Sequence, residues 1–191
     1  MVGVILAGGA GRRLGGGKAG REAAGRPLAA YAADALAAVA ETVAIVGKSG
    51  EGLPDLPGVE RWDDEPREPR HPAMGIVHAL DRAGGEPVLV CAADMPFVGA
   101  GECAAIAEAA SPGRAVVASA GAVLEPLLGL YPPAARGALH DGALRGAPMR
   151  ALAAELDPLP VELPSRALRS VNTESALRLA DGELRQLRSI T

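Results

Sequence analysis

A short apolar run from Val2 to Leu6 leads directly into a glycine-rich segment, Ala7 to Gly17. An apolar run of this length that ends in glycines is typical of a buried strand in a parallel sheet. Glycines permit positive φ angles and close backbone approach, so consecutive N–H groups can converge on phosphate oxygens. The chain is therefore expected to begin with a strand that feeds a polyphosphate-binding loop, and the alternative is a solvated surface loop.

Helical and extended patterns alternate after this loop. Pro27 precedes apolar residues at 28, 31, 32, 35, 36 and 39, a spacing that predicts an amphipathic helix. Further patterns predict strands at 42–46, 59–62 and 87–92, helices at 73–83 and 102–110, and a polar loop at 63–72. The alternation predicts an α/β fold, a single three-layer domain over residues 1–191 with a mostly parallel sheet and helices on both faces. Ligands of such sheets bind at the carboxyl ends of the strands.

The later half of the chain is less regular. Its patterns predict strands at 115–119, 124–131 and 159–163 and short helices at 133–139 and 149–156. Thr173 is placed to cap a last helix that runs to about residue 189, with Gly182 as a weak point inside it.

Composition excludes several classes of protein. Hydrophobic residues make up 49% and charged residues 22%, which is globular composition, and a net charge of −4 without a basic stripe argues against nucleic-acid binding. The two cysteines suit a reducing compartment and indicate neither a disulfide framework nor a zinc cluster. The N-terminal apolar run is too short for a signal peptide or a membrane span. We therefore expect a cytoplasmic protein with no membrane partner.

The glycine-rich segment does not match two well-known phosphate-binding motifs. A Walker A loop would need glycine in place of Arg12 and a hydroxyl residue in place of Ala19. A dinucleotide fingerprint that starts at Gly9 has Leu14 where its third glycine belongs, and no acid stands near Val46 to bind a ribose. Both a P-loop NTPase and a Rossmann dehydrogenase are disfavoured.

Five segments resemble, in the right order, the motifs of the MobA-like nucleotidyltransferase family. Leu6 to Lys18 resembles the signature Leu-Ala-Gly-Gly-x-x-x-Arg-Met-Gly-x-Asp-Lys, with Leu14 for the methionine and Gly17 for the aspartate. The other four segments are His71-Pro-Ala-Met-Gly-Ile76, Cys91-Ala-Ala-Asp-Met-Pro96, Pro126-Leu-Leu-Gly-Leu-Tyr131 and Val171-Asn-Thr-Glu-Ser-Ala-Leu177. The resemblance extends over nearly the whole chain and implies a Rossmann-like nucleotidyltransferase fold.

The resemblance implies transfer of GMP from Mg-GTP to the phosphate of Mo-molybdopterin, with release of pyrophosphate. Its substrates would be GTP and molybdopterin, its cofactor Mg²⁺, and its protein partners other enzymes of molybdenum cofactor biosynthesis or the enzymes that receive the cofactor. A phosphate acceptor is largely dianionic near neutral pH, so no general base is expected. The alternatives are a nucleotidyltransferase that uses CTP or another phosphorylated acceptor, and a non-catalytic nucleotide-binding relative.

The same resemblance assigns roles to individual residues. The expected catalytic residues are Arg13, Lys18 and Asp94, of which Asp94 also ligates the metal and the two cations hold the β- and γ-phosphates. The expected nucleotide-binding residues are Leu6, Ala7, Gly8, Gly9, Gly11, Lys18, Asp63, Asp64 and Asp94, where the choice between Asp63 and Asp64 stays open. The expected substrate-binding residues are Pro72, Gly75 and Asn172, and a local cap is an equal interpretation of Asn172.

Three positions depart from the family pattern. Gly17 removes the acid before Lys18, His71 replaces a glycine, and the segment from Val46 lacks the family's asparagine. His71 is either a titratable group near the pocket or a solvated loop residue. The choice between guanine and cytosine stays open, because loop backbone contacts leave little trace in residue letters.

Overall fold

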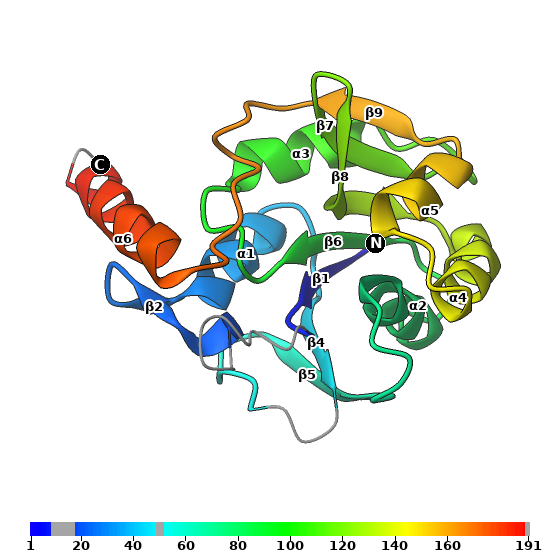
Figure 1. Ribbon diagram of the computed structural model, residues 1–191, viewed down its shortest axis with the longest axis horizontal. Coiled ribbons are helices and arrows are strands. Elements are labelled where there is room, and N and C mark those ends of the chain that lie inside the picture. Colours follow the sequence, from blue (N-terminus) through cyan, green and yellow to red (C-terminus); the bar gives the residue numbers. More distant parts are fainter. Residues whose placement is uncertain (9–17, 49–51, 190–191) are drawn as a thin grey trace.

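The computed structural model describes residues 1–8, 18–48 and 52–189. Its main feature is a seven-stranded sheet with the order β5-β4-β1-β6-β8-β7-β9 (Figure 1). The strands are β1 (Val2–Leu6), β4 (Val43–Lys48), β5 (Glu60–Glu65), β6 (Val88–Ala92), β7 (Val116–Ala120), β8 (Val123–Tyr131) and β9 (Leu159–Glu162). Neighbouring strands are parallel, except that β8 is antiparallel to β6 and β7. The predicted mostly parallel sheet is confirmed.

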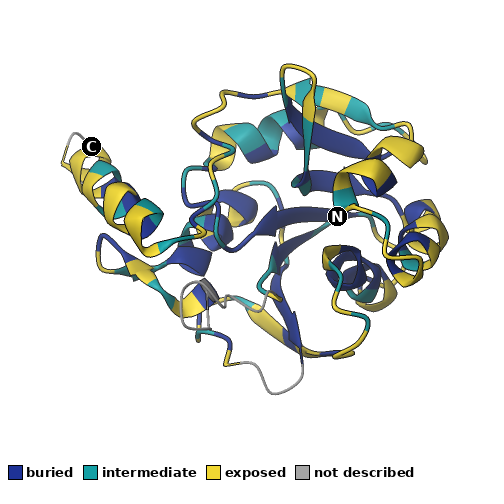
Figure 2. Cartoon of the chain, viewed as in Figure 1, coloured by how far each residue is buried: buried dark blue, intermediate teal, exposed yellow. Residues whose placement is uncertain are grey.

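Helices cover both faces of this sheet. The helices that cover it are α1 (Leu28–Ala37), α2 (Pro72–Arg82), α3 (Ala100–Glu108), α4 (Arg136–Leu144) and α5 (Met149–Glu155), and a further helix, α6 (Glu174–Arg188), lies away from the sheet. Ile5 of β1 packs with Leu36 of α1 and Ile106 of α3, whereas the preceding residue, Val4, packs in a second cluster with Ile76 of α2. Successive strand residues point to opposite faces, so the two clusters are the two sides of the sheet. The three predicted layers are confirmed, and the central strands lie buried between the helices (Figure 2).

The last helix packs beside a small hairpin rather than on the sheet. The hairpin pairs β2 (Glu22–Ala23) with β3 (Arg26–Pro27), and Leu28 at its end shares a third apolar cluster with Leu177 and Leu184 of α6 (Figure 1). The predicted cap is confirmed, because the Thr173 hydroxyl accepts from the Ala176 N–H at 3.1 Å. The α6 helix also continues through Gly182, as expected.

Several boundaries differ from the expectation. The strand predicted at 59–62 continues to Glu65, so the polar loop expected from Asp63 begins three residues later. The helix predicted at 133–139 is a 3-10 turn, Pro133–Ala135, followed by α4. The short hairpin was not predicted, because two-residue strands carry no periodicity. Among the helices of the described ranges, none is long and apolar enough to cross a membrane.

Candidate active site

A cavity of about 330 Å³ opens at the edge of the sheet where β1, β4, β5 and β6 end. Its size lies in the range of small-molecule sites. Because β8 runs in the opposite direction, its first half reaches the same edge. The lining residues are Leu6, Ala7, Gly8, Val46, Glu65, His71, Pro72, Gly75, Ala92, Ala93, Asp94, Glu125, Leu127, Ser170 and Asn172. Segments far apart in the sequence therefore converge at the carboxyl edge, where α/β sheets bind ligands.

Backbone hydrogen bonds fix the strand ends around this cavity. The Ala7 N–H donates to the Val46 carbonyl at 2.9 Å, and the Ala93 N–H donates to the Leu6 carbonyl at 3.0 Å. The Val171 N–H donates to the Asp94 carbonyl at 2.8 Å, which holds the segment before α6 against the end of β6. Asp94 and Asn172 are thereby brought to one cavity from positions far apart in the chain.

The cavity contains seven of the residues to which the resemblance assigns a catalytic or binding role, namely Leu6, Ala7, Gly8, Pro72, Gly75, Asp94 and Asn172. Gly9, Gly11 and Arg13 lie outside the described residues. Lys18 begins a 3-10 turn, Lys18–Gly20. Asp63 and Asp64 do not line the cavity. Both are exposed on β5.

These two aspartates have other partners. Asp64 accepts from the Arg82 guanidinium at 2.9 Å and lies 3.0 Å from the His78 ring, both on α2. Desolvation acts to raise the pKa of Asp64, but its own backbone hydrogen bond and the contacts with His78 and Arg82 lower the pKa overall. Asp63 pairs with Arg61 of the same strand at 3.0 Å. Their contact with nucleotide stays a prediction.

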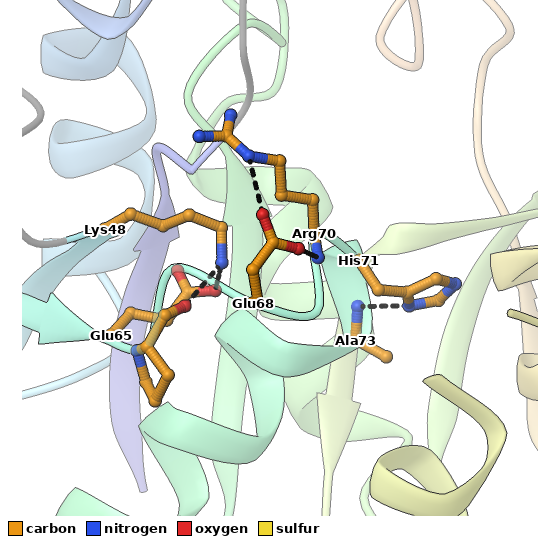
Figure 3. A network of polar contacts seen from close by, with 7 residues as sticks. Lys48, Glu65, Glu68, Arg70, His71 and Ala73 are labelled. Carbon is orange, nitrogen blue, oxygen red and sulfur yellow. Dashed lines mark hydrogen bonds and ion pairs between the residues drawn. The ribbon is translucent and has the colours of Figure 1, made fainter. Parts of the chain in front are cut away.

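The acid that β5 presents to the cavity is Glu65. Its Oε1 accepts from the Lys48 Nζ at 2.7 Å, and the same Nζ donates to the Pro66 carbonyl at 2.8 Å (Figure 3). Glu65 is 2% and Lys48 5% exposed, which is rare for charged residues that lack a partner. Sequence reasoning identified neither residue as part of the site.

A register shift between β4 and β5 explains this omission. Val46 pairs with Trp62, and regular pairing would set Lys48 opposite Asp64, but the strands shift so that Lys48 faces Glu65. A shift of one residue moves side chains to the opposite face of a strand. The only signal in the sequence is the presence of opposite charges at the ends of two expected neighbouring strands.

His71 holds two segments together at the cavity wall. Its Nδ1 accepts from the Ala73 N–H at 3.1 Å and so caps α2 (Figure 3). Its Nε2 lies 2.8 Å from the Ala147 carbonyl. Neither interpretation of His71 from the sequence included this structural role. The imidazole joins α2 to the segment that precedes α5.

The far end of the cavity is lined by β8. Burial raises the pKa of the Glu125 carboxyl, against smaller opposing effects from the Leu127 N–H and Arg150. Glu125 lies 3.6 Å from the Arg150 guanidinium, and both residues also line a second, open hollow of about 310 Å³ with Pro126, Leu127, Pro148 and Met149. The two hollows meet at Glu125 and Leu127. The Arg150 guanidinium therefore lies beside the cavity, at the end opposite Glu65.

A magnesium ion that shares substrate phosphates needs few protein ligands. Mg²⁺ keeps several waters and is held by one or two carboxylates together with phosphate oxygens. Within the described ranges, no group of three or more His, Cys, Asp and Glu side chains is placed to hold a metal ion. Asp94 at the end of β6 supplies one carboxylate to the cavity, which fits a phosphate-bound Mg²⁺ and does not fit an all-protein metal cage.

The sheet topology, the cavity at its carboxyl edge and the half-buried Asp94 are typical of an α/β protein with a ligand site at the ends of its strands. The model of the MobA-like NTP transferase domain matches residues 3–159. The chain belongs to this family and is a nucleotidyltransferase, as the sequence motifs indicated.

Relatives of known name support this assignment. The chain is 35% identical over 141 residues to the molybdenum cofactor guanylyltransferase of Cereibacter sphaeroides, a match that covers 70% of each chain. Its fold is similar to that of molybdopterin-guanine dinucleotide biosynthesis protein A from Archaeoglobus fulgidus, with a TM-score of 0.76, 21% identity and coverage of 97% of this chain and 100% of the other. The 2-C-methyl-D-erythritol 4-phosphate cytidylyltransferase of Thermus thermophilus has the same fold, with a TM-score of 0.69, 21% identity and coverage of 95% of this chain and 98% of the other.

Proposed function

We propose that the protein transfers GMP from Mg-GTP to the phosphate of Mo-molybdopterin, which yields molybdopterin guanine dinucleotide and pyrophosphate. The observation that carries this proposal is the joining of Leu6, Ala7 and Gly8 to Asp94 and Asn172 in one cavity. The name of the Cereibacter sphaeroides relative supports the choice of substrates.

In the proposed reaction, an oxygen of the acceptor phosphate attacks the α-phosphorus of GTP, and the bond to the bridging oxygen of pyrophosphate breaks. The acceptor needs no general base, because its second pKa is about 6. The protein contributes positioning and charge neutralisation. Magnesium, when bound, neutralises the charge of the phosphates and of the leaving pyrophosphate.

The chain's own residues divide this task along the edge of the sheet. Asp94 would hold the metal beside the phosphates, and the backbone of Leu6 to Gly8 would contact the nucleotide. Lys18, together with Arg13, would neutralise the β- and γ-phosphates. Asn172, brought to the cavity by the Val171–Asp94 hydrogen bond, would bind the acceptor, whereas Pro72 and Gly75 line the cavity from α2.

The acceptor would enter from the β8 end of the cavity. Arg150 lines the adjoining hollow, and its guanidinium is suited to a phosphate oxygen pair. We expect Arg150→Met to raise the KM for the acceptor about 10-fold and to leave the KM for GTP unchanged. Arg145→Met is the matched control, because Arg145 is exposed, pairs with Glu155 and lines neither hollow.

The direct test is an assay of pyrophosphate release with purified molybdopterin, GTP and Mg²⁺. The wild-type protein should release pyrophosphate with GTP, and Asp94→Asn should lower kcat by about 100-fold or more. Asp141→Asn, an exposed acid on α4, should retain activity. Turnover with CTP in place of GTP would favour a cytidylyltransferase, and full activity of Asp94→Asn would remove Asp94 from the metal site.

A further inference from the structure

The buried Lys48–Glu65 pair differs from an ordinary ion pair because one of its carboxylate oxygens faces the cavity. The Oε1 of Glu65 accepts from Lys48, which is itself held by the Pro66 carbonyl. The Oε2 lies 3.0 Å from the position that a Cβ on Gly8 would occupy and 3.7 Å from the corresponding position on Gly75. Both glycines line the cavity, so their missing side chains leave Oε2 as part of its wall.

The position of Glu65 along the sheet indicates which part of a nucleotide it would meet. Glu65 ends β5 and Asp94 follows β6, with β4 and β1 between them in the sheet. At about 4.8 Å per strand, three inter-strand steps separate the two acids by roughly 14 Å. A nucleoside triphosphate with its phosphates at Asp94 would therefore extend its base towards Glu65.

A carboxylate can distinguish the bases by their donors. An ionised carboxylate accepts hydrogen bonds and cannot donate them. Guanine presents two adjacent donors, N1–H and the N2 amine, on one edge. Adenine and cytosine each present a single exocyclic amine beside an acceptor nitrogen, and uracil presents one N–H between two carbonyls. Only guanine offers a donor pair to this acceptor.

We propose that Glu65, oriented by Lys48, is the residue that selects guanine over the other bases. This inference rests on the proposed nucleotide transfer and adds the determinant of its base preference. Lys48 acts as a positioning residue, because it fixes one oxygen of Glu65 and leaves the other towards the base. The glycines at positions 8 and 75 allow the base to approach this oxygen.

The ion pair makes a specific prediction for Glu65→Gln. The ammonium of Lys48 is a donor only, so the glutamine carbonyl should remain on Lys48 and the amide NH₂ should take the place of Oε2. This NH₂ would oppose the donors of guanine. It would match xanthine, which carries a carbonyl in place of the N2 amine.

The experiment measures dissociation constants of GTP, ITP and XTP by calorimetry in the presence of Mg²⁺. Wild-type protein should bind GTP about 10- to 100-fold more tightly than ITP, which lacks the N2 amine. Glu65→Gln should weaken the binding of GTP by a similar factor and strengthen the binding of XTP, so that the variant binds XTP more tightly than GTP. Glu60→Gln is the control, since Glu60 lies at the far end of β5 and accepts from the Trp62 indole. It should leave all three constants unchanged.

The outcomes separate this inference from the proposed function. Equal binding of GTP and ITP by the wild-type protein overturns the inference even if Glu65→Gln does not fold. An unchanged GTP-to-XTP ratio in a folded Glu65→Gln variant overturns it as well, while nucleotide transfer stands. Failure of the wild-type protein to bind any nucleotide overturns both.

Discussion

The imidazole of His71 bridges the Ala73 N–H, which donates to Nδ1, and the Ala147 carbonyl, which lies 2.8 Å from Nε2. With Nδ1 as acceptor, the neutral ring carries its proton on Nε2 and donates it to Ala147. The side chain thus performs two tasks that the glycine expected at this position cannot perform. It caps α2 and it holds the chain before α5 beside the cavity.

Removal of this bridge should cost measurable stability. We expect His71→Ala to lower the free energy of unfolding by about 1–3 kcal/mol, since both the cap and a hydrogen bond are lost. His71→Asn should cost about half as much, because asparagine also caps helices but is too short to reach Ala147. Urea denaturation measures both, with His140→Ala, a change of a half-buried histidine on α4, as control. Equal midpoints for His71→Ala and wild type would contradict the bridge.

The Lys48–Glu65 pair should show the energetics of a buried ion pair. Lys48→Met leaves the Glu65 carboxylate buried without its cation, and we expect a loss of about 3–5 kcal/mol. The double variant Lys48→Met/Glu65→Leu should be more stable than Lys48→Met alone, because it removes both charges. Arg61→Met, which breaks the exposed pair with Asp63, should cost no more than about 1 kcal/mol. A double variant that is no more stable than Lys48→Met would show that the two side chains are not coupled.

Two helical glycines should respond differently to alanine. A Cβ on Gly75 of α2 would lie 3.2 Å from the Leu6 Cδ2 and would narrow the cavity. Gly75→Ala should therefore weaken nucleotide binding about 10-fold. Gly182 of α6 has nothing within 4 Å of its Cβ position, so Gly182→Ala should raise stability by about 0.5–1 kcal/mol. Calorimetry and urea denaturation measure the two effects, and unchanged affinity in Gly75→Ala would contradict its place in the cavity wall.

Glu125 should make stability depend on pH in a defined direction. Burial raises its pKa in the folded protein above the value of the unfolded chain, so the folded state binds the proton more tightly. The contribution of Glu125 to stability is therefore fully present below the unfolded pKa and is lost as pH rises through the folded pKa. Glu125→Gln should stabilise the protein at pH 7, and this gain should shrink as pH falls towards about 4.5. A gain that is constant between these pH values would contradict the raised pKa.

The periodicity of the sequence predicted the strand–helix alternation because each element buries a regular apolar face. The run from Val2 to Leu6 and the Thr173 cap are local signals, and both appear in the structure as expected. The place of Asp94 in the cavity was predictable because this residue stands two positions after an apolar strand whose carboxyl end faces the ligand edge.

The Lys48–Glu65 pair was not predictable in this way. Its formation depends on a register shift between two strands, which reflects the packing of the whole sheet rather than the letters of either strand. The same shift turns Glu65 into the cavity and leaves its neighbour in the sequence, Asp64, exposed. The link from His71 to Ala147 likewise joins residues that are 76 positions apart and carry no common motif.

The most direct measurement is the thermal stability of the purified protein with GTP, CTP, ATP and UTP in turn, with and without Mg²⁺. A ligand that binds the folded state raises its apparent stability in proportion to the logarithm of its concentration relative to Kd. We predict a rise in Tm with GTP and Mg²⁺ and little change with the other three nucleotides. A rise with CTP instead, or no rise with any nucleotide, would contradict a guanylyltransferase site at this edge of the sheet.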